Sequence, residues 1–219
     1  HNPGQVIHSA VSHIPLGPEL EQSIPEIKGF TRFSRFFDEV LLSYDDKRFL
    51  ESNGAYADPG DFKMFSVAFL SGDPDRVFDE PNSLVLSKDF AEKSFGDIDP
   101  VNQVMQLEGF FDLKVTGVIE NIPANSHLKY DFIVPIVLFE RWGTDISDWN
   151  YWGTLYTYIL LNDDADPALV DGKLEHYLKR FYTDTGDRLY LQALKRIHLH
   201  SFGRINYDNY SSLEDIRFI

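Results

Sequence analysis

Cysteine is absent from this 219-residue chain, so neither a disulfide framework nor a zinc site with cysteine ligands can form. Long apolar runs are missing too. The longest candidate, residues 133–139, is interrupted by Pro135 and falls well short of the roughly 20 residues that a membrane helix needs. The chain begins at His1 without methionine or a signal-peptide pattern. We therefore expect a segment that was excised or processed from a longer protein.

Basic residues are few: 20 Lys and Arg stand against 35 Asp and Glu, which gives a formal net charge of −15. Such a surface repels phosphate backbones, and we exclude nucleic acid as a partner. The charge suits a basic partner or a cationic substrate. It is also an ordinary means of keeping a protein in solution, and we favour that simpler interpretation.

Motifs for nucleotide binding and hydrolysis are missing as well. No Walker-type phosphate loop occurs, so we predict no nucleotide cofactor. Ser126, His127 and Asp131 are the residue types of a catalytic triad, but adjacent residues rarely face each other as a triad requires. No glycine-flanked nucleophile elbow surrounds the serine. We predict no catalytic residue and no enzyme activity.

Candidate metal ligands are isolated in the sequence. His198 and His200 lie two apart on a predicted strand, so both point to one face with a spacing that suits a metal ion. A third ligand has no obvious local source, and a surface pair of imidazoles is the simpler interpretation. Acidic pairs such as Asp97 and Asp99 serve as turn formers or helix caps and complete no calcium loop. We predict no metal site and no cofactor.

Aromatic residues are abundant, with 18 Phe and 11 Tyr, and they indicate a sheet-rich interior. Strand and helix patterns occur together, which predicts an α+β fold. The clearest elements are a hairpin turning at Asp45-Asp46, a strand at 84–86, a helix at 88–95 between Ser87 as N-cap and Gly96, a hairpin of 104–107 and 113–119, and a strand at 155–161. A helix capped by Asp166 carries the apolar stripe Val170, Leu174, Tyr177, Leu178 and Phe181, and 189–191 and 197–199 are further strand candidates.

The texture of the sequence changes at Ser83. From there to about residue 148, short strand signals alternate with turn signals, and this pattern predicts a compact β-rich unit.

If the chain has a functional surface, we expect it in two exposed segments. The first is the tip of the second hairpin, formed by Glu108, Gly109, Phe110 and Phe111. Adjacent residues of a hairpin point to opposite faces, so one of the two phenylalanines is expected to be exposed. The second is the loop of Asn125, Ser126, His127 and Leu128. We predict these eight residues as a partner or substrate surface.

A series of short motifs runs along nearly the whole chain. They are Pro25-Glu26-Ile27; Ala57-Asp58 followed by Phe62 and Phe65-Ser66; Gly72-Asp73-Pro74; Ser83-Leu84-Val85-Leu86-Ser87 with Ala91 and Phe95-Gly96; Asp99-Pro100; Val115-Thr116-Gly117-Val118; Pro123 with Asn125-Ser126-His127-Leu128; Tyr158-Ile159-Leu160-Leu161; and Ile197-His198-Leu199-His200-Ser201. In order and spacing the series resembles the periplasmic core domain of MacB-like and FtsX-like ABC-transporter permeases, especially those of Bacteroidetes-type bacteria. Asn102 departs from the family pattern, which usually has glycine there, and suggests a slightly different turn.

The resemblance implies a discontinuous porter-like βαβ subdomain, residues 1–82 and 149–219, with an inserted β-rich, sabre-like subdomain at 83–148. It implies a place at the periplasmic face of the bacterial inner membrane, between two transmembrane helices of the same chain. ATP hydrolysis would occur on a cytoplasmic ATPase subunit or domain, and this segment would transmit the resulting motion in export, efflux or lipoprotein release. A second permease copy and a periplasmic partner protein are further candidate partners.

Two other classes stay open. A secreted or periplasmic ligand-binding or sensor module would share the α+β character and would contain a preformed apolar pocket. A metal-dependent hydrolase would need a third ligand beside His198 and His200.

Overall fold

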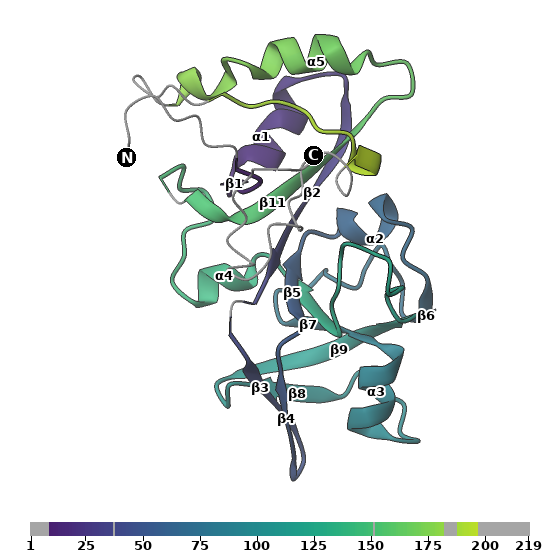
Figure 1. Ribbon diagram of the computed structural model, residues 1–219. Coiled ribbons are helices and arrows are strands. Elements are labelled where there is room, and N and C mark those ends of the chain that lie inside the picture. The colour runs from purple at the N-terminus through teal and green to yellow at the C-terminus, as the bar shows by residue number, and fades with distance from the viewer. Residues whose placement is uncertain (1–8, 37, 151, 182–187, 197–219) are drawn as a thin grey trace. The chain divides into compact units, whose positions relative to one another are not determined.

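The computed structural model describes residues 9–36, 38–150, 152–181 and 188–196. The chain divides into two compact units, a terminal unit of residues 1–30 and 146–219 and a central unit of residues 31–145. Strand β2 (Ile27–Arg35) passes from the first unit into the second (Figure 1). Within the described ranges, no helix combines the length and apolarity needed to cross a membrane.

The central unit is built on a mixed sheet. After β2, its strands are β3 (Val40–Tyr44), β4 (Lys47–Glu51), β5 (Gly54–Ala57), β6 (Phe69–Ser71), β7 (Ser83–Ser87), β8 (Val104–Leu107), β9 (Phe111–Ile119) and β10 (Phe132–Pro135). Their order in the sheet is β2-β5-β10-β7-β9-β8-β3-β4, and β6 pairs with β9. The pairs β5–β10 and β7–β9 are parallel, whereas β3–β4 and β8–β9 are the two predicted hairpins.

Helix α3 (Lys88–Phe95) packs on this sheet because its apolar residues share one side. Phe90 and Phe95 are buried in the same core as Met105 and Leu113 of the β8–β9 hairpin. The predicted cap is confirmed: the Ser87 hydroxyl accepts a hydrogen bond from the backbone N–H of Phe90 at 3.3 Å. Two shorter helices, α2 (Gly60–Met64) and α4 (Leu138–Arg141), lie in the connections after β5 and β10.

The terminal unit contains β1 (Ser12–His13), α1 (Leu16–Ser23), β11 (Trp152–Leu161) and α5 (Pro167–Leu174), followed by the short 3-10 helices η1 (Tyr177–Arg180) and η2 (Leu194–Arg196). β1 pairs antiparallel with β11. Leucines of α1 share a core with the predicted stripe of α5. The predicted cap of α5 is confirmed, because the Asp166 carboxylate accepts from the N–H of Ala168 at 2.9 Å.

Two local predictions in the terminal unit are wrong. The apolar stripe predicted from Val170 to Phe181 does not lie on one continuous helix. Helix α5 ends at Leu174, and the backbone of His176 is not helical before η1 begins. Residues 189–191 form no strand, and the N–H of Leu191 donates instead to the Asp171 carboxylate at 2.5 Å. The candidate strand at 197–199 lies outside the described residues.

The predicted α+β fold is confirmed by the large mixed sheet and the few helices. The predicted bounds of an inserted subdomain at 83–148 stay a prediction.

Candidate functional site

The tip of the β8–β9 hairpin is hydrogen-bonded to the neighbouring strand β3. Glu108 and Gly109 both have positive φ, 55° and 70°, and are the central residues of a tight turn in which the N–H of Phe110 donates to the Leu107 carbonyl at 3.1 Å. Glu108 is tied to β3 twice, because its N–H donates to the Leu41 carbonyl at 2.8 Å and its Oε1 accepts from the Leu41 N–H at 2.6 Å. The tip is therefore held in place by a neighbouring strand as well as by its own turn.

The two phenylalanines of the tip have different environments. Phe110 is 84% exposed. Phe111 is half-buried, lies opposite Leu107 across the hairpin, and packs against Trp142 with 4.6 Å between ring centroids. The expectation that one of the pair is exposed is thus confirmed. The role of the tip as a contact surface stays a prediction.

The second predicted surface, residues 125–128, is only partly exposed. Asn125 is exposed, but Leu128 is 3% exposed. The Ser126 hydroxyl accepts from the N–H of Leu128 at 3.2 Å, which closes the loop locally. The His127 ring meets the Phe65 ring edge to face, with centroids 5.7 Å apart. This loop is therefore packed against the segment that follows α2.

The structure does not bring the two predicted surfaces together. Residues 108–111 precede and begin β9, whereas 125–128 follow its end at Ile119. An extended strand rises about 3.3 Å per residue, so opposite ends of this nine-residue strand are separated by on the order of 27 Å. The tip and the loop must be considered as separate surfaces.

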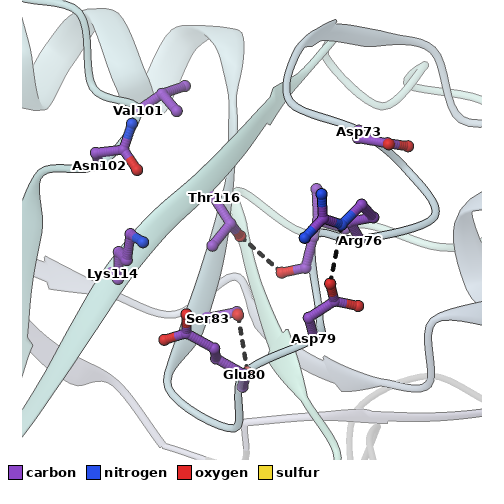
Figure 2. Close-up of a pocket in the computed structure, with 10 residues that line it drawn as sticks. Asp73, Arg76, Asp79, Glu80, Ser83, Val101, Asn102, Lys114 and Thr116 are labelled. Carbon is purple, nitrogen blue, oxygen red and sulfur yellow. Dashed lines mark hydrogen bonds and ion pairs between the residues drawn. The ribbon is translucent and has the colours of Figure 1, made fainter.

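A polar pocket of about 320 Å³ lies beside the middle of β9. Here the strand paired with β9 changes from β8 to β6. Figure 2 shows its wall, formed by the loop before β7, the turn at Asn102, and the side chains of Lys114 and Thr116 on β9. The Thr116 hydroxyl donates to the Val77 carbonyl at 2.8 Å and fastens the loop to the strand. Asn102 has a φ of 68°, so the turn keeps a conformation that glycine adopts readily.

Charges of both signs line the pocket. Arg76 is paired with Asp79 at 3.1 Å, and Asp73 and Glu80 add negative charge. Lys114 forms no ion pair within the described residues. The wall is polar, unlike the apolar pocket expected of a ligand-binding module, and its mixed charge selects no single class of ligand. This pocket was not predicted from the sequence, although the motifs at 72–74 and 99–100 contain or adjoin residues that line it.

A buried polar cluster in the central unit was also missed. The Arg32 guanidinium binds both carboxylate oxygens of Asp58, at 2.7 and 2.8 Å. Close by, the carboxyl group of Asp61 is fully buried and accepts a hydrogen bond from the Tyr130 hydroxyl at 3.2 Å. The pKa of Asp61 is raised to about 7, chiefly by burial. The hydrogen bond from Tyr130 opposes this rise, and the negative charge of Asp58 adds to it. Burial also raises the pKa of Tyr130.

The described residues assemble no group of three or more candidate metal ligands. His198 and His200 lie outside those residues. Two of the residues considered for a catalytic triad, His127 and Asp131, make other contacts. The His127 ring packs against Phe65, and the Asp131 carboxylate accepts a hydrogen bond from the Asn53 side chain at 3.0 Å.

Comparison with known proteins gives a match to the family model of the MacB-like periplasmic core domain over residues 3–177. No curated protein matches the chain. Solved structures with a similar fold include a domain from Porphyromonas gingivalis described as belonging to a permease protein, with a TM-score of 0.66, 21% identity, and 79% of each chain covered.

Two further structures have the same fold at lower identity. The periplasmic region of MacB from Actinobacillus actinomycetemcomitans has a TM-score of 0.63 and 14% identity, and the match covers 86% of this chain and 82% of that one. The extracellular domain of the noncanonical ABC-type transporter YknZ from Gram-positive bacteria has a TM-score of 0.61 and 13% identity, with 84% and 90% covered. The family match spans most of the sequence and the fold agrees with it, so this chain belongs to the MacB-like periplasmic core domain family.

Proposed function

We propose that this chain is the extracytoplasmic domain of an ABC-transporter permease and that it transmits motion of the membrane helices to a periplasmic substrate or partner protein. The observation that carries the proposal is the family match over residues 3–177. In this view the domain sits at the outer face of the bacterial inner membrane, is joined to transmembrane helices of the same polypeptide, and depends on a cytoplasmic ATPase subunit or domain. The domain itself carries out no catalysis.

The division of the chain into two units supports a mechanical role. Each unit has a core of its own, so each can move as a body. The chain passes between them within β2 and again after Asp145. Motion of the membrane helices would reach the central unit through these connections. The predicted porter-like and sabre-like subdomains, 1–82 with 149–219 and 83–148, are a separate proposal with other bounds; the moving bodies here are the two compact units.

The tip of the β8–β9 hairpin is the proposed contact surface for a partner or substrate, and the loop at 125–128 is the second. A rigidly held, exposed aromatic ring is typical of residues that dominate binding energy, because little conformational entropy is lost when it is buried. Phe110 has an exposed ring on a turn whose backbone is hydrogen-bonded to β3 through Glu108.

This 219-residue chain contains no cysteine, so labels introduced into it report on single positions once any cysteine elsewhere in the full-length protein is replaced. One cysteine at Asp46 in the β3–β4 turn and another at Asp164 in the turn after β11 would place a spin label in each unit of the full-length protein. We expect the distance distribution between the labels to change when ATP is added to the reconstituted transporter, and to stay constant with an ATPase-inactive partner. A matched pair within the central unit, Asp46 and Asp97, should not respond.

Membrane fractionation of the full-length product is the companion measurement. An integral membrane protein whose labelled units respond to ATP would support the proposal. The proposal would be overturned, in favour of a secreted or periplasmic binding module, by a product that is absent from the membrane fraction or by label distances that do not change when ATP is added.

A further inference from the structure

Within the described residues, the Asp61 carboxyl group forms no ion pair. It is fully buried at the start of α2, and its Oδ2 accepts a hydrogen bond from Tyr130. Its Oδ1 has no hydrogen-bond partner within the described part of the chain. An ionised carboxylate in such a place is strongly destabilising, whereas a protonated carboxyl group is tolerated.

The charged groups around Asp61 do not neutralise it. Arg32 of β2 is bound through its guanidinium to both oxygens of Asp58. Asp58 itself acts on Asp61 as a like charge. Lys63 of α2 reaches outward and pairs with Asp75 at the surface.

Segment 121–131 contributes two titratable groups that contact α2 or the residue directly after it. These are the Tyr130 hydroxyl on Asp61 and the His127 imidazole on Phe65. Lys129 is exposed, and Asp131 is bound to Asn53.

Segment 121–131 contacts α2 and the residue directly after it, and one of these contacts involves Asp61. The hydroxyl of Tyr130, which is itself buried, donates to the Asp61 carboxyl group. Phe65, directly after α2, packs against His127. The same segment contains the proposed contact surface at 125–128. Anything that forces water onto Asp61 must therefore loosen the attachment of this loop.

We propose that Asp61 is a proton-controlled latch: protonated, it keeps segment 121–131 closed on α2, and loss of the proton allows the segment to open. The biological role of the latch rests on the proposed function, because residues 125–128 are a contact surface only in that proposal. The latch itself is a property of the domain and can be measured without transport.

The direction of the effect follows from the two states. In the open state the carboxyl group is hydrated and has its ordinary pKa of 3.8, whereas in the closed state burial raises the pKa of Asp61 to about 7. The closed state therefore binds the proton more tightly. Between these two values the opening equilibrium rises by about tenfold per pH unit, and it levels off above about pH 7. The loop is held most firmly in acid and opens more often toward neutral pH.

Hydrogen exchange on the whole 219-residue chain tests the latch. The readout is the protection factor of the backbone amides in 121–131, with intrinsic exchange rates divided out, from about pH 5 to pH 8. We expect protection to fall by about tenfold per pH unit up to near pH 7 and then to level off. Asp61→Asn should make protection independent of pH. The matched control Asp97→Asn removes an exposed carboxylate and should behave as the wild type.

Two more variants identify the titrating group. Tyr130→Phe removes the hydrogen bond that lowers the pKa of Asp61, so the levelling-off should move to higher pH. An imidazole ordinarily titrates near pH 6.5, within the same window, so His127→Gln must retain the wild-type profile. The proposal is overturned if Asp61→Asn retains the pH dependence or if His127→Gln abolishes it. Neither result bears on whether the domain transmits motion.

Discussion

Arg32 and Asp58 form a bidentate ion pair in the interior of the central unit. Nε of Arg32 lies 2.7 Å from Oδ2 of Asp58 and Nη2 lies 2.8 Å from Oδ1, while the backbone N–H of Arg32 donates to the same Oδ2 at 2.8 Å. One carboxylate thus satisfies three donors. Asp58 also connects β2 to the start of α2, because its backbone carbonyl accepts a hydrogen bond from the N–H of Asp61.

Breaking this pair should strongly destabilise the domain. Asp58→Ala leaves a buried guanidinium without its counter-ion, and we expect the free energy of unfolding to fall by about 3–5 kcal/mol in urea denaturation at pH 7. Asp75→Ala is the matched control, since it removes only the exposed pair with Lys63 and should cost less than about 1 kcal/mol. Equal losses in the two variants would contradict the structural role of the buried pair.

The Asp61 carboxyl group should make global stability depend on pH. Its pKa is raised from 3.8 to about 7 on folding, so the stabilisation is fully present below pH 3.8 and is lost as the pH rises through 7. At about 1.4 kcal/mol per pKa unit, the loss is on the order of 4 kcal/mol.

The difference in unfolding free energy between Asp61→Asn and the wild type isolates this effect. We expect it to shift in favour of the variant between about pH 4.5 and 7.5 and to stay constant above that. A difference that does not vary with pH would show that Asp61 does not titrate in this range.

Substitutions at Phe110 and Phe111 should separate an effect on partner binding from an effect on the free energy of unfolding. Phe110→Ala removes an exposed ring, so we expect a change in unfolding free energy within about 0.5 kcal/mol. Phe111→Ala removes the half-buried ring that packs on Trp142 and should cost about 1–3 kcal/mol. With the full-length protein, photocrosslinking from position 110 should trap a partner or substrate. The absence of any crosslink during turnover would argue against the tip as a contact surface.

Gly72 should be far less replaceable than Gly96. Both have positive φ, 90° and 62°, but a Cβ at position 72 would lie 2.5 Å from the Thr116 carbonyl oxygen, whereas nothing lies within 4 Å at position 96. We expect Gly96→Ala to cost about 1–3 kcal/mol for the backbone conformation alone, because a φ of 62° with a ψ of −121° is readily adopted only by glycine, and Gly72→Ala to cost clearly more. Thermal unfolding of the two variants compares them directly, and similar melting temperatures would contradict the close approach.

Local signals in the sequence predicted local structure well. The Ser87 cap, the Asp166 cap and the hairpin turn at Glu108 depend on residues within a few positions of each other, and each is present as predicted. The family resemblance, carried by motif order, is confirmed by the family match. Such features follow from short-range chemistry or from spacing that the sequence displays directly.

The buried polar cluster could not be predicted in this way. Asp58 meets Arg32 across 26 positions, and Asp61 meets Tyr130 across 69. In sequence, Asp58 and Asp61 stand beside Pro59 and Gly60 and resemble ordinary turn residues. Only the sheet order, which sets β5 between β2 and β10, brings their partners within reach.

That sheet order also sets the sequence of events when the domain folds. β10 is the last strand of the central unit to be synthesised, yet it fills the gap between β5 and β7 in the middle of the sheet. Until it arrives, β5 and β7 each present an unpaired edge that could join another chain. Completion of the sheet must therefore wait for residues near 135, and the nascent chain is most in need of protection from aggregation just before they emerge.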